Sequence, residues 1–178
     1  MIAIIEKAAN GTARVVRIVG QTAAWLGLAL VLLVAFNVLS RYAFGISSVA
    51  TQEAEWHLMA AGALLGMSYG LNQGGEVRVD VLYDKFSPEL KATIDIIAAL
   101  MLMLASIFIV WLSINYVHQS YAIGEISPDP GGLHYRFLLK ALIPVAFVLL
   151  ALQALSMMLE NIVRRAHLKQ PLANPDKH

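Results

Sequence analysis

Long apolar stretches separated by short polar segments organise the whole chain. A membrane-spanning helix needs about 20 mainly apolar residues to cross the roughly 30 Å hydrocarbon core of a bilayer. The first and third stretches each run for 22 residues without a charged side chain, whereas the second has an uncharged part of only about 16 residues. The predicted spans are residues 18–39, 53–71, 96–117 and 141–159. The pattern predicts an all-α membrane protein with four transmembrane helices.

Two shorter segments are predicted to be amphipathic helices at the membrane interface. Residues 1–17 mix three basic side chains with isoleucine and valine. In residues 79–86 the apolar positions recur at i, i+3, i+4 and i+7, with charged side chains off that stripe. We therefore expect three parts: a cytoplasmic or interfacial segment at 1–17, a four-helix transmembrane domain at 18–160 and a cytoplasmic basic tail at 161–178.

A glycine pair and a charged patch separate the two apolar halves. Gly74 and Gly75 predict a turn where the second span leaves the membrane. The 16 residues from Glu76 to Lys91 carry four acids and three bases, a density too costly for the hydrocarbon core. Ser87, followed by a proline and a glutamate, predicts the start of the next helix.

The distribution of basic residues predicts the topology. With four spans, both termini and the central loop share one side of the membrane and hold ten of the 13 lysines and arginines. The other two loops hold Arg41, Arg136 and Lys140. Because cytoplasmic loops are enriched in lysine and arginine, both termini are expected to be cytoplasmic.

Composition narrows the function classes. Only 14% of the residues are charged, against about 25% in a soluble domain, and the mean hydropathy is +0.66. The absence of cysteine excludes disulfides, thiol nucleophiles and cysteine-ligated metals. No metal-ligand spacing or phosphate-binding glycine loop occurs, so no cofactor is expected. The basic residues follow membrane topology, which makes membrane lipids rather than nucleic acid the expected partner. The first apolar run is too long for a signal peptide and is expected to remain as an anchor.

Glycines in the second span suggest helix packing. Gly62, Gly66, Gly70 and Gly74 recur every four residues and fall on one ridge, an arrangement typical of closely packed membrane helices. The same segment, 66–70, matches the G-x-S-x-G serine hydrolase motif around Ser68. That motif needs a strand-to-helix turn, so a packing ridge is the better interpretation and no enzymatic activity is expected.

Ionisable residues near the span ends allow two interpretations. They could form a proton relay or ion site, which would make the chain an independent small channel or carrier. Salt bridges and headgroup contacts are the favoured interpretation, because all of them map to helix ends. The residues concerned are Glu53, Glu55, His57, Asp95 and His118. Arg41 is expected to pair with Glu53 or Glu55 and so to pin the hairpin of the first two spans.

The connection between the third and fourth spans is rich in turn-forming residues. Two prolines and two glycines within residues 127–132 exclude a continuous helix. The wider segment 123–136, which carries Glu125, Asp129 and Arg136, could form a restrained docking platform for a soluble partner, or only a rigid connector. Pro144 is expected to loosen or kink the first turns of the fourth span.

Several short motifs, in order along residues 15–160, resemble the small permease (DctQ-type) subunit of TRAP transporters, the tripartite ATP-independent periplasmic transporters. They include Asn37-Val-Leu-Ser-Arg41-Tyr42, Gln52-Glu53-Ala-Glu55-Trp56-His57, Gly74-Gly75-Glu76-Val77-Arg78-Val79-Asp80, Ser127-Pro128-Asp129-Pro130-Gly131-Gly132 and Tyr135-Arg136 with Lys140-Ala-Leu-Ile-Pro144. Glu76 stands where the family often has histidine, so any role of that histidine does not carry over.

The resemblance implies a subunit of a secondary transporter in a bacterial or archaeal inner membrane. In that family a large permease subunit holds the substrate and ion sites, and a periplasmic substrate-binding protein delivers the substrate, typically an organic acid anion. The small subunit is expected to brace the large one and to help form the docking surface. The chain itself shows no broken helix pair and no inverted repeat, both usual in a self-sufficient carrier.

Overall fold

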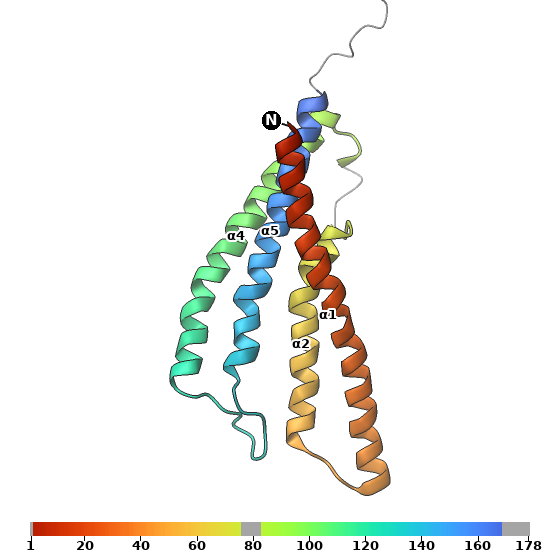
Figure 1. Ribbon diagram of the computed structural model, residues 1–178, viewed down its shortest axis with the longest axis vertical. Coiled ribbons are helices and arrows are strands. Elements are labelled where there is room, and N and C mark those ends of the chain that lie inside the picture. The colour runs from red at the N-terminus through yellow and green to blue at the C-terminus, as the bar shows by residue number, and fades with distance from the viewer. Residues whose placement is uncertain (1, 76–82, 169–178) are drawn as a thin grey trace, which may run out of the picture.

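The computed structural model describes residues 2–75 and 83–168, and most of these residues are helical. The helices are α1 (Ile2–Phe44), α2 (Val49–Asn72), α4 (Pro88–Ala122) and α5 (Phe137–Leu168) (Figure 1). Helices α1, α4 and α5 are long and apolar enough to cross a membrane. Helix α2 is not among them and carries Glu53 and Glu55 near its start. The all-helical fold is therefore confirmed, whereas the count of four spans stays a prediction.

The helices form one elongated bundle with two distinct ends (Figure 1). We call the end that holds the N-terminus, the start of α4 and the end of α5 the terminal end. The opposite end holds the connections 45–48 and 123–136, and we call it the loop end. This is the grouping of segments that the four-span prediction requires. Residues 79–82 of the amphipathic helix predicted at 79–86 lie outside the described residues.

Helix α1 runs without a break through residues 2–17, so this segment is continuous with the first predicted span, and its place at the membrane interface stays a prediction. Its buried positions are small or medium-sized and recur at alternating spacings of four and three, as in a coiled coil. In the first half of the helix they are Ala9, Ala13, Val16, Gly20 and Ala23. The N-terminal turns of α1 are therefore part of the packed bundle.

Helices α4 and α5 form the most extensively packed pair. The buried face of α4 repeats a small residue every seven positions, at Ala92, Ala99, Ser106, Ser113 and Ser120. Small side chains let two helix backbones approach closely, and a seven-residue repeat keeps them on one seam. The hydroxyls of Ser106 and Ser113 each donate to a carbonyl of their own helix at 2.7 Å, so their burial leaves no unpaired donor.

Helix α5 is the centre of the bundle. It packs against α4, α1 and α2, and α1 also packs against α2. Among the described helices, α4 packs extensively only against α5. Pro144 lies inside α5, which continues as a helix through it, so the proline does not end the element.

Two helix boundaries match the sequence predictions. Helix α2 ends in a Schellman motif: the Gly75 amide donates to the Gly70 carbonyl at 2.9 Å and Gly74 has a φ of 79°. Helix α4 begins at a serine cap, where the Ser87 hydroxyl accepts from the Leu90 amide at 3.3 Å.

The glycine ridge of α2 does not pack against any other helix that the structure describes. A Cβ atom added at Gly62, Gly66 or Gly70 would meet no atom within 4 Å. The close helix contact is instead at Gly20 of α1, where an added Cβ would lie 2.3 Å from the Tyr69 Cβ. The close approach of α1 and α2 therefore depends on a glycine that the four-residue spacing does not include.

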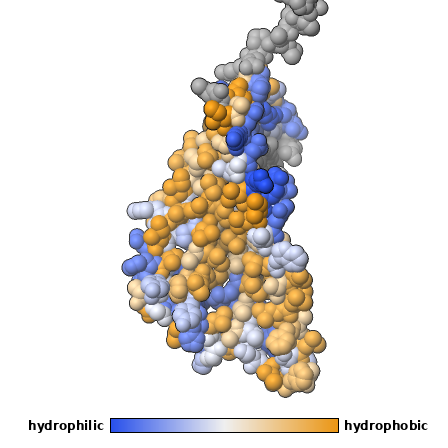
Figure 2. Space-filling view, viewed as in Figure 1, coloured by the Kyte–Doolittle hydropathy of each residue, from blue (hydrophilic) through white to orange (hydrophobic). Residues whose placement is uncertain are grey.

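Large apolar side chains remain exposed along the bundle. On the face shown in Figure 2 hydrophobic residues cover most of the middle and the lower right, whereas hydrophilic residues gather along the right edge of the upper half and at the lower left. On α1 and α4 this surface includes Leu28, Val31, Leu32, Ile107, Phe108 and Trp111. Such a surface suits contact with lipid or with other apolar helices.

Candidate functional site

The polar residues of the loop end form a network that fixes the connection between α4 and α5 onto α2. Glu53, in the second turn of α2, is only 5% exposed. Its carboxylate accepts a hydrogen bond from the buried Ser127 hydroxyl and another, 2.6 Å long, from the Leu133 amide. The buried charge is thus paired with two donors from a segment about 80 residues away. We call this arrangement the Glu53 latch.

The Glu53 latch leaves no space for a side chain at position 132, which is a glycine. A Cβ atom at this position would lie 2.4 Å from the Ser127 Oγ and 2.8 Å from the Glu53 Oε2. The neighbouring Gly131 has a φ of 80°, and the Gly132 amide donates to the Asp129 carbonyl at 3.0 Å. The glycine pair therefore serves a turn, as the sequence predicted, and a close approach to Ser127 and Glu53 that the sequence did not indicate.

Glu125 belongs to a second polar cluster and is not a free surface charge. Its carboxylate accepts from the Lys140 ammonium group and, at 2.6 Å, from the Ser120 hydroxyl. The same ammonium group lies 4.2 Å from the centre of the Tyr116 ring. The hydrogen bond from Lys140, followed by that from Ser120, lowers the pKa of Glu125 against the opposing effect of burial. Of the two acids expected to present charge in this loop, only Asp129 is exposed.

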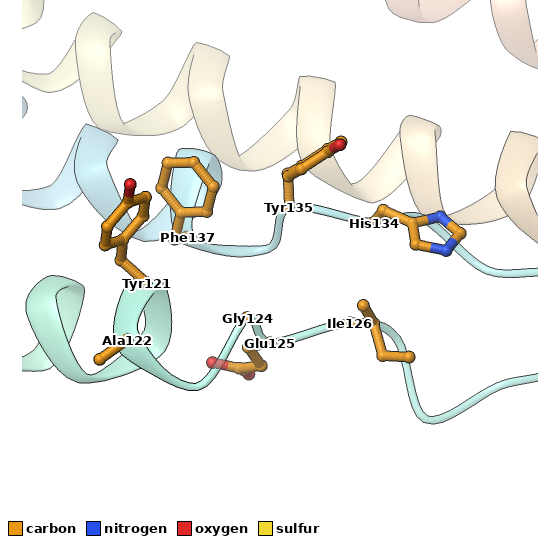
Figure 3. A pocket seen from close by; sticks show the side chains of 8 residues that line it. All are labelled: Tyr121, Ala122, Gly124, Glu125, Ile126, His134, Tyr135 and Phe137. Carbon is orange, nitrogen blue, oxygen red and sulfur yellow. The ribbon is translucent and has the colours of Figure 1, made fainter.

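A pocket of about 480 Å³ opens beside this cluster (Figure 3). One side is aromatic, with the Tyr121 and Phe137 rings packed edge to face at 5.1 Å. Tyr135 extends this side, is 68% exposed and has a φ of 63°, an unusual conformation for a bulky residue. The opposite side is formed by Ala122, Gly124, Glu125 and Ile126. The loop end thus presents exposed aromatic rings on a restrained backbone.

The α1–α2 hairpin is held by an amide, not by the arginine that the sequence suggested. Asn37 is buried and its side-chain amide donates to the Glu55 Oε1 at 2.9 Å. Arg41 lies with Glu55 and Trp56 around a shallow pocket, but no ion pair joins it to a described acid. The expected Arg41–glutamate pair is therefore wrong. A lone asparagine in an apolar span, one helical turn before Arg41, was the signal that could have indicated the true contact.

The middle and the terminal end of the bundle have a separate set of polar contacts. The Asn72 amide donates to the Gln153 Oε1 at 3.0 Å, and the Ser156 hydroxyl donates to the Ala9 carbonyl at 2.9 Å, which ties α2 and α1 to α5. Asp95 lies 3.9 Å from the Arg164 guanidinium, a helix-end salt bridge of the kind expected for this acid.

The ionisable helix-end residues do not converge on one site. Glu53 and Glu55 bind different partners at the loop end, whereas Asp95 lies near the start of α4, at the terminal end. His118 is exposed on α4. Within residues 2–75 and 83–168, no group of three or more histidines and acids could hold a metal ion.

Ser68 lacks the setting of a hydrolase nucleophile. It is 1% exposed, lies in the interior of α2 and donates to the Leu65 carbonyl of its own helix at 3.4 Å. The remaining predicted interface residues, Glu76, Arg78 and Asp80, lie outside the described residues.

Comparison with known proteins agrees with this helical membrane architecture. Residues 30–164 match the DctQ component of tripartite ATP-independent periplasmic transporters. A curated relative, the ectoine TRAP transporter small permease protein TeaB of Halomonas elongata, is 27% identical over 129 residues, which cover 72% of this chain and 66% of the relative. No solved structure matches the chain. The match over residues 30–164 spans most of the chain, which therefore belongs to the family of DctQ components, the small membrane subunits of TRAP transporters.

Proposed function

We propose that this chain is the non-catalytic small subunit of a binding-protein-dependent importer that is driven by an ion gradient and carries organic acid anions. It spans a bacterial or archaeal inner membrane four times, with both termini in the cytoplasm. It braces the large permease subunit and helps to dock the periplasmic substrate-binding protein. The DctQ match over residues 30–164 is the observation that supports this proposal best. The relative's name includes ectoine, but the residues that select a substrate are expected on the other subunits.

The open glycine ridge of α2 supports the bracing role. Gly66 lies in the middle of the helix with space for a side chain, and small residues let membrane helices from two chains approach closely. We expect Gly66→Leu to lose co-purification with the large permease while the isolated chain stays folded. Gly27→Leu, at an equally open glycine of α1, is the matched control and should co-purify normally. If Gly66→Leu assembles and supports transport, the ridge faces lipid.

The loop end supports the docking role. The Glu53 latch fixes the connection 123–136, and Asp129 is exposed on it. Exposed charges at an interface act mainly on the rate of encounter. Asp129→Lys should therefore slow transport when the binding protein is limiting, and more binding protein should restore the rate. Asp84→Lys, also exposed but on the predicted cytoplasmic side, is the control. Normal transport by Asp129→Lys at every concentration would leave the loop as a connector.

Topology can be tested separately. The chain contains no cysteine, so single cysteines can be introduced at exposed positions without background labelling. Cysteines at Ser47 and Asp129 should react with an impermeant thiol reagent added from the periplasm, and a cysteine at Asp84 should not. Labelling of position 84 from outside would contradict the assignment.

Reconstitution separates this proposal from an independent channel or carrier. The purified chain alone in vesicles should move no solute down or against an ion gradient. The complex with its large permease and binding protein should do so. Solute movement by this chain alone would contradict the subunit role.

A further inference from the structure

At the terminal end, α4 and α5 leave a small hollow between them that the proposed function does not use. It has a volume of about 330 Å³ and is lined by Ile96 of α4 and by Ile162, Arg165 and Ala166 of α5. Its walls are therefore apolar except for one guanidinium group. Among the described residues, the Arg165 Nε is the single buried side-chain nitrogen or oxygen without a hydrogen-bond partner. A buried donor left unpaired costs free energy, so an acceptor from outside the chain would stabilise this site.

The neighbouring arginine, Arg164, differs from Arg165 in having an acidic partner among the described residues. Arg164 is half exposed and lies 3.9 Å from the Asp95 Oδ2. No ion pair joins Arg165 to an acid among the described residues. Two consecutive arginines thus have different surroundings: one faces a carboxylate of this chain, and the other faces an apolar hollow.

The position of the hollow along the helices indicates what could fill it. Ile96 is the first residue of the predicted third span, and the predicted fourth span ends at residue 159. Arg165 lies six residues beyond that end, which corresponds to about 9 Å along an α-helix. The apolar wall therefore lies at the edge of the hydrocarbon core, and the guanidinium lies at the depth of the lipid phosphates.

We propose that this hollow binds one anionic phospholipid of the cytoplasmic leaflet. The lipid phosphate accepts hydrogen bonds from the Arg165 guanidinium group, and the first carbons of an acyl chain lie against Ile96 and Ile162. A guanidinium group matches the geometry of phosphate oxygens, and basic pockets between membrane helices are typical headgroup sites. The apolar walls favour a lipid over an acidic side chain of another subunit, because a carboxylate would use the guanidinium but leave the hollow empty.

Thermal unfolding of the full-length chain purified in detergent tests this proposal. The probes are phosphatidylglycerol, phosphatidylcholine and water-soluble glycerol 3-phosphate. Phosphatidylglycerol should raise the unfolding temperature in a saturable way, and the other two should not. Arg165→Gln should weaken the apparent affinity for phosphatidylglycerol by about tenfold or more, since a charge-assisted hydrogen bond is lost. Arg17→Gln removes an exposed charge at the same end and should leave the affinity unchanged.

A second variant keeps the test decisive if Arg165→Gln does not fold. Ala166→Phe fills the hollow and retains the charge, so it should also lose the response to phosphatidylglycerol. An undiminished response in Ala166→Phe would overturn the proposal, as would equal stabilisation by phosphatidylcholine or an equal loss in Arg17→Gln. Stabilisation by glycerol 3-phosphate would indicate a site for free phosphate. If Arg165→Gln keeps the lipid response but no longer assembles with the large permease, the guanidinium binds protein instead.

Discussion

Two glycines of the α1–α2 hairpin should respond to the same substitution with opposite signs. Gly20 is buried where α1 crosses α2, and an added Cβ would lie 2.3, 2.4 and 2.6 Å from three atoms of Tyr69, the nearest being its Cβ. A Cβ atom cannot move away without its backbone, so Gly20→Ala must separate the two helices. Overpacking of this kind costs about 1–3 kcal/mol of stability. At Gly66 the same methyl group meets no atom within 4 Å, and alanine favours a helix over glycine by about 1 kcal/mol.

The assay is unfolding of the isolated chain in detergent, followed by circular dichroism against temperature or denaturant. Gly20→Ala should unfold earlier than the wild type, and Gly66→Ala should unfold at the same point or later. A double-mutant cycle with Tyr69→Gly, which removes all three clashing atoms, should show that much of the cost of Gly20→Ala disappears. Equal stability of Gly20→Ala and Gly66→Ala would refute the assignment of the close helix contact.

Three other predictions concern the loop end and the hairpin. Gly132→Ala should destabilise the connection 123–136 by about 1–3 kcal/mol and accelerate its hydrogen exchange, because its Cβ would lie 2.4 Å from the Ser127 Oγ. Because the pKa of Glu125 is lowered from 4.5, the ionised carboxylate contributes its full stability above about pH 4.5, and this contribution is lost as the pH falls through the folded-state pKa. The wild type should therefore lose stability in acid more steeply than Glu125→Gln. Asn37→Leu should lower the unfolding temperature more than Arg41→Leu, because Asn37, and not Arg41, is hydrogen-bonded to Glu55. A larger loss in Arg41→Leu would support the ion pair between Arg41 and a glutamate instead.

Hydrophobic patterning was sufficient to predict the helices but not which faces pack together. Runs without charge, the serine cap at Ser87 and the Gly74–Gly75 turn are local signals, and the structure confirms the helical elements and both boundaries. Packing depends on which small residues recur on a face. The small residues that recur every seven positions in α4, from Ala92 to Ser120, are present in the sequence. Alanine and serine are common in helices, so this repeat alone is a weak signal of packing. The more conspicuous glycine series of α2 remains open in this chain.

Polar contacts could be predicted from the sequence only where the two residues lie close together along the chain. Glu53 and Gly132 were both identified as structural residues, yet nothing in the sequence indicates that they share one site, because 79 positions separate them. The Arg41 prediction used charge alone and overlooked a neutral amide that donates equally well in an apolar span. Arg165 was counted only as part of a basic tail, since burial of its Nε depends on how α4 and α5 meet.

The central position of α5 has a consequence for how the protein is made. Ribosomes synthesise a chain from its N-terminus, so α1 and α2 can pair before the second half exists, whereas α4 has no extensive partner until α5 has been synthesised. During that interval the small-residue seam of α4, including Ser106 and Ser113, would face lipid or the insertion machinery. A ribosome stalled before residue 137 would leave α4 without its partner and expose it to membrane proteases. Completion of the last helix is therefore the step that commits the newly made chain to its bundle.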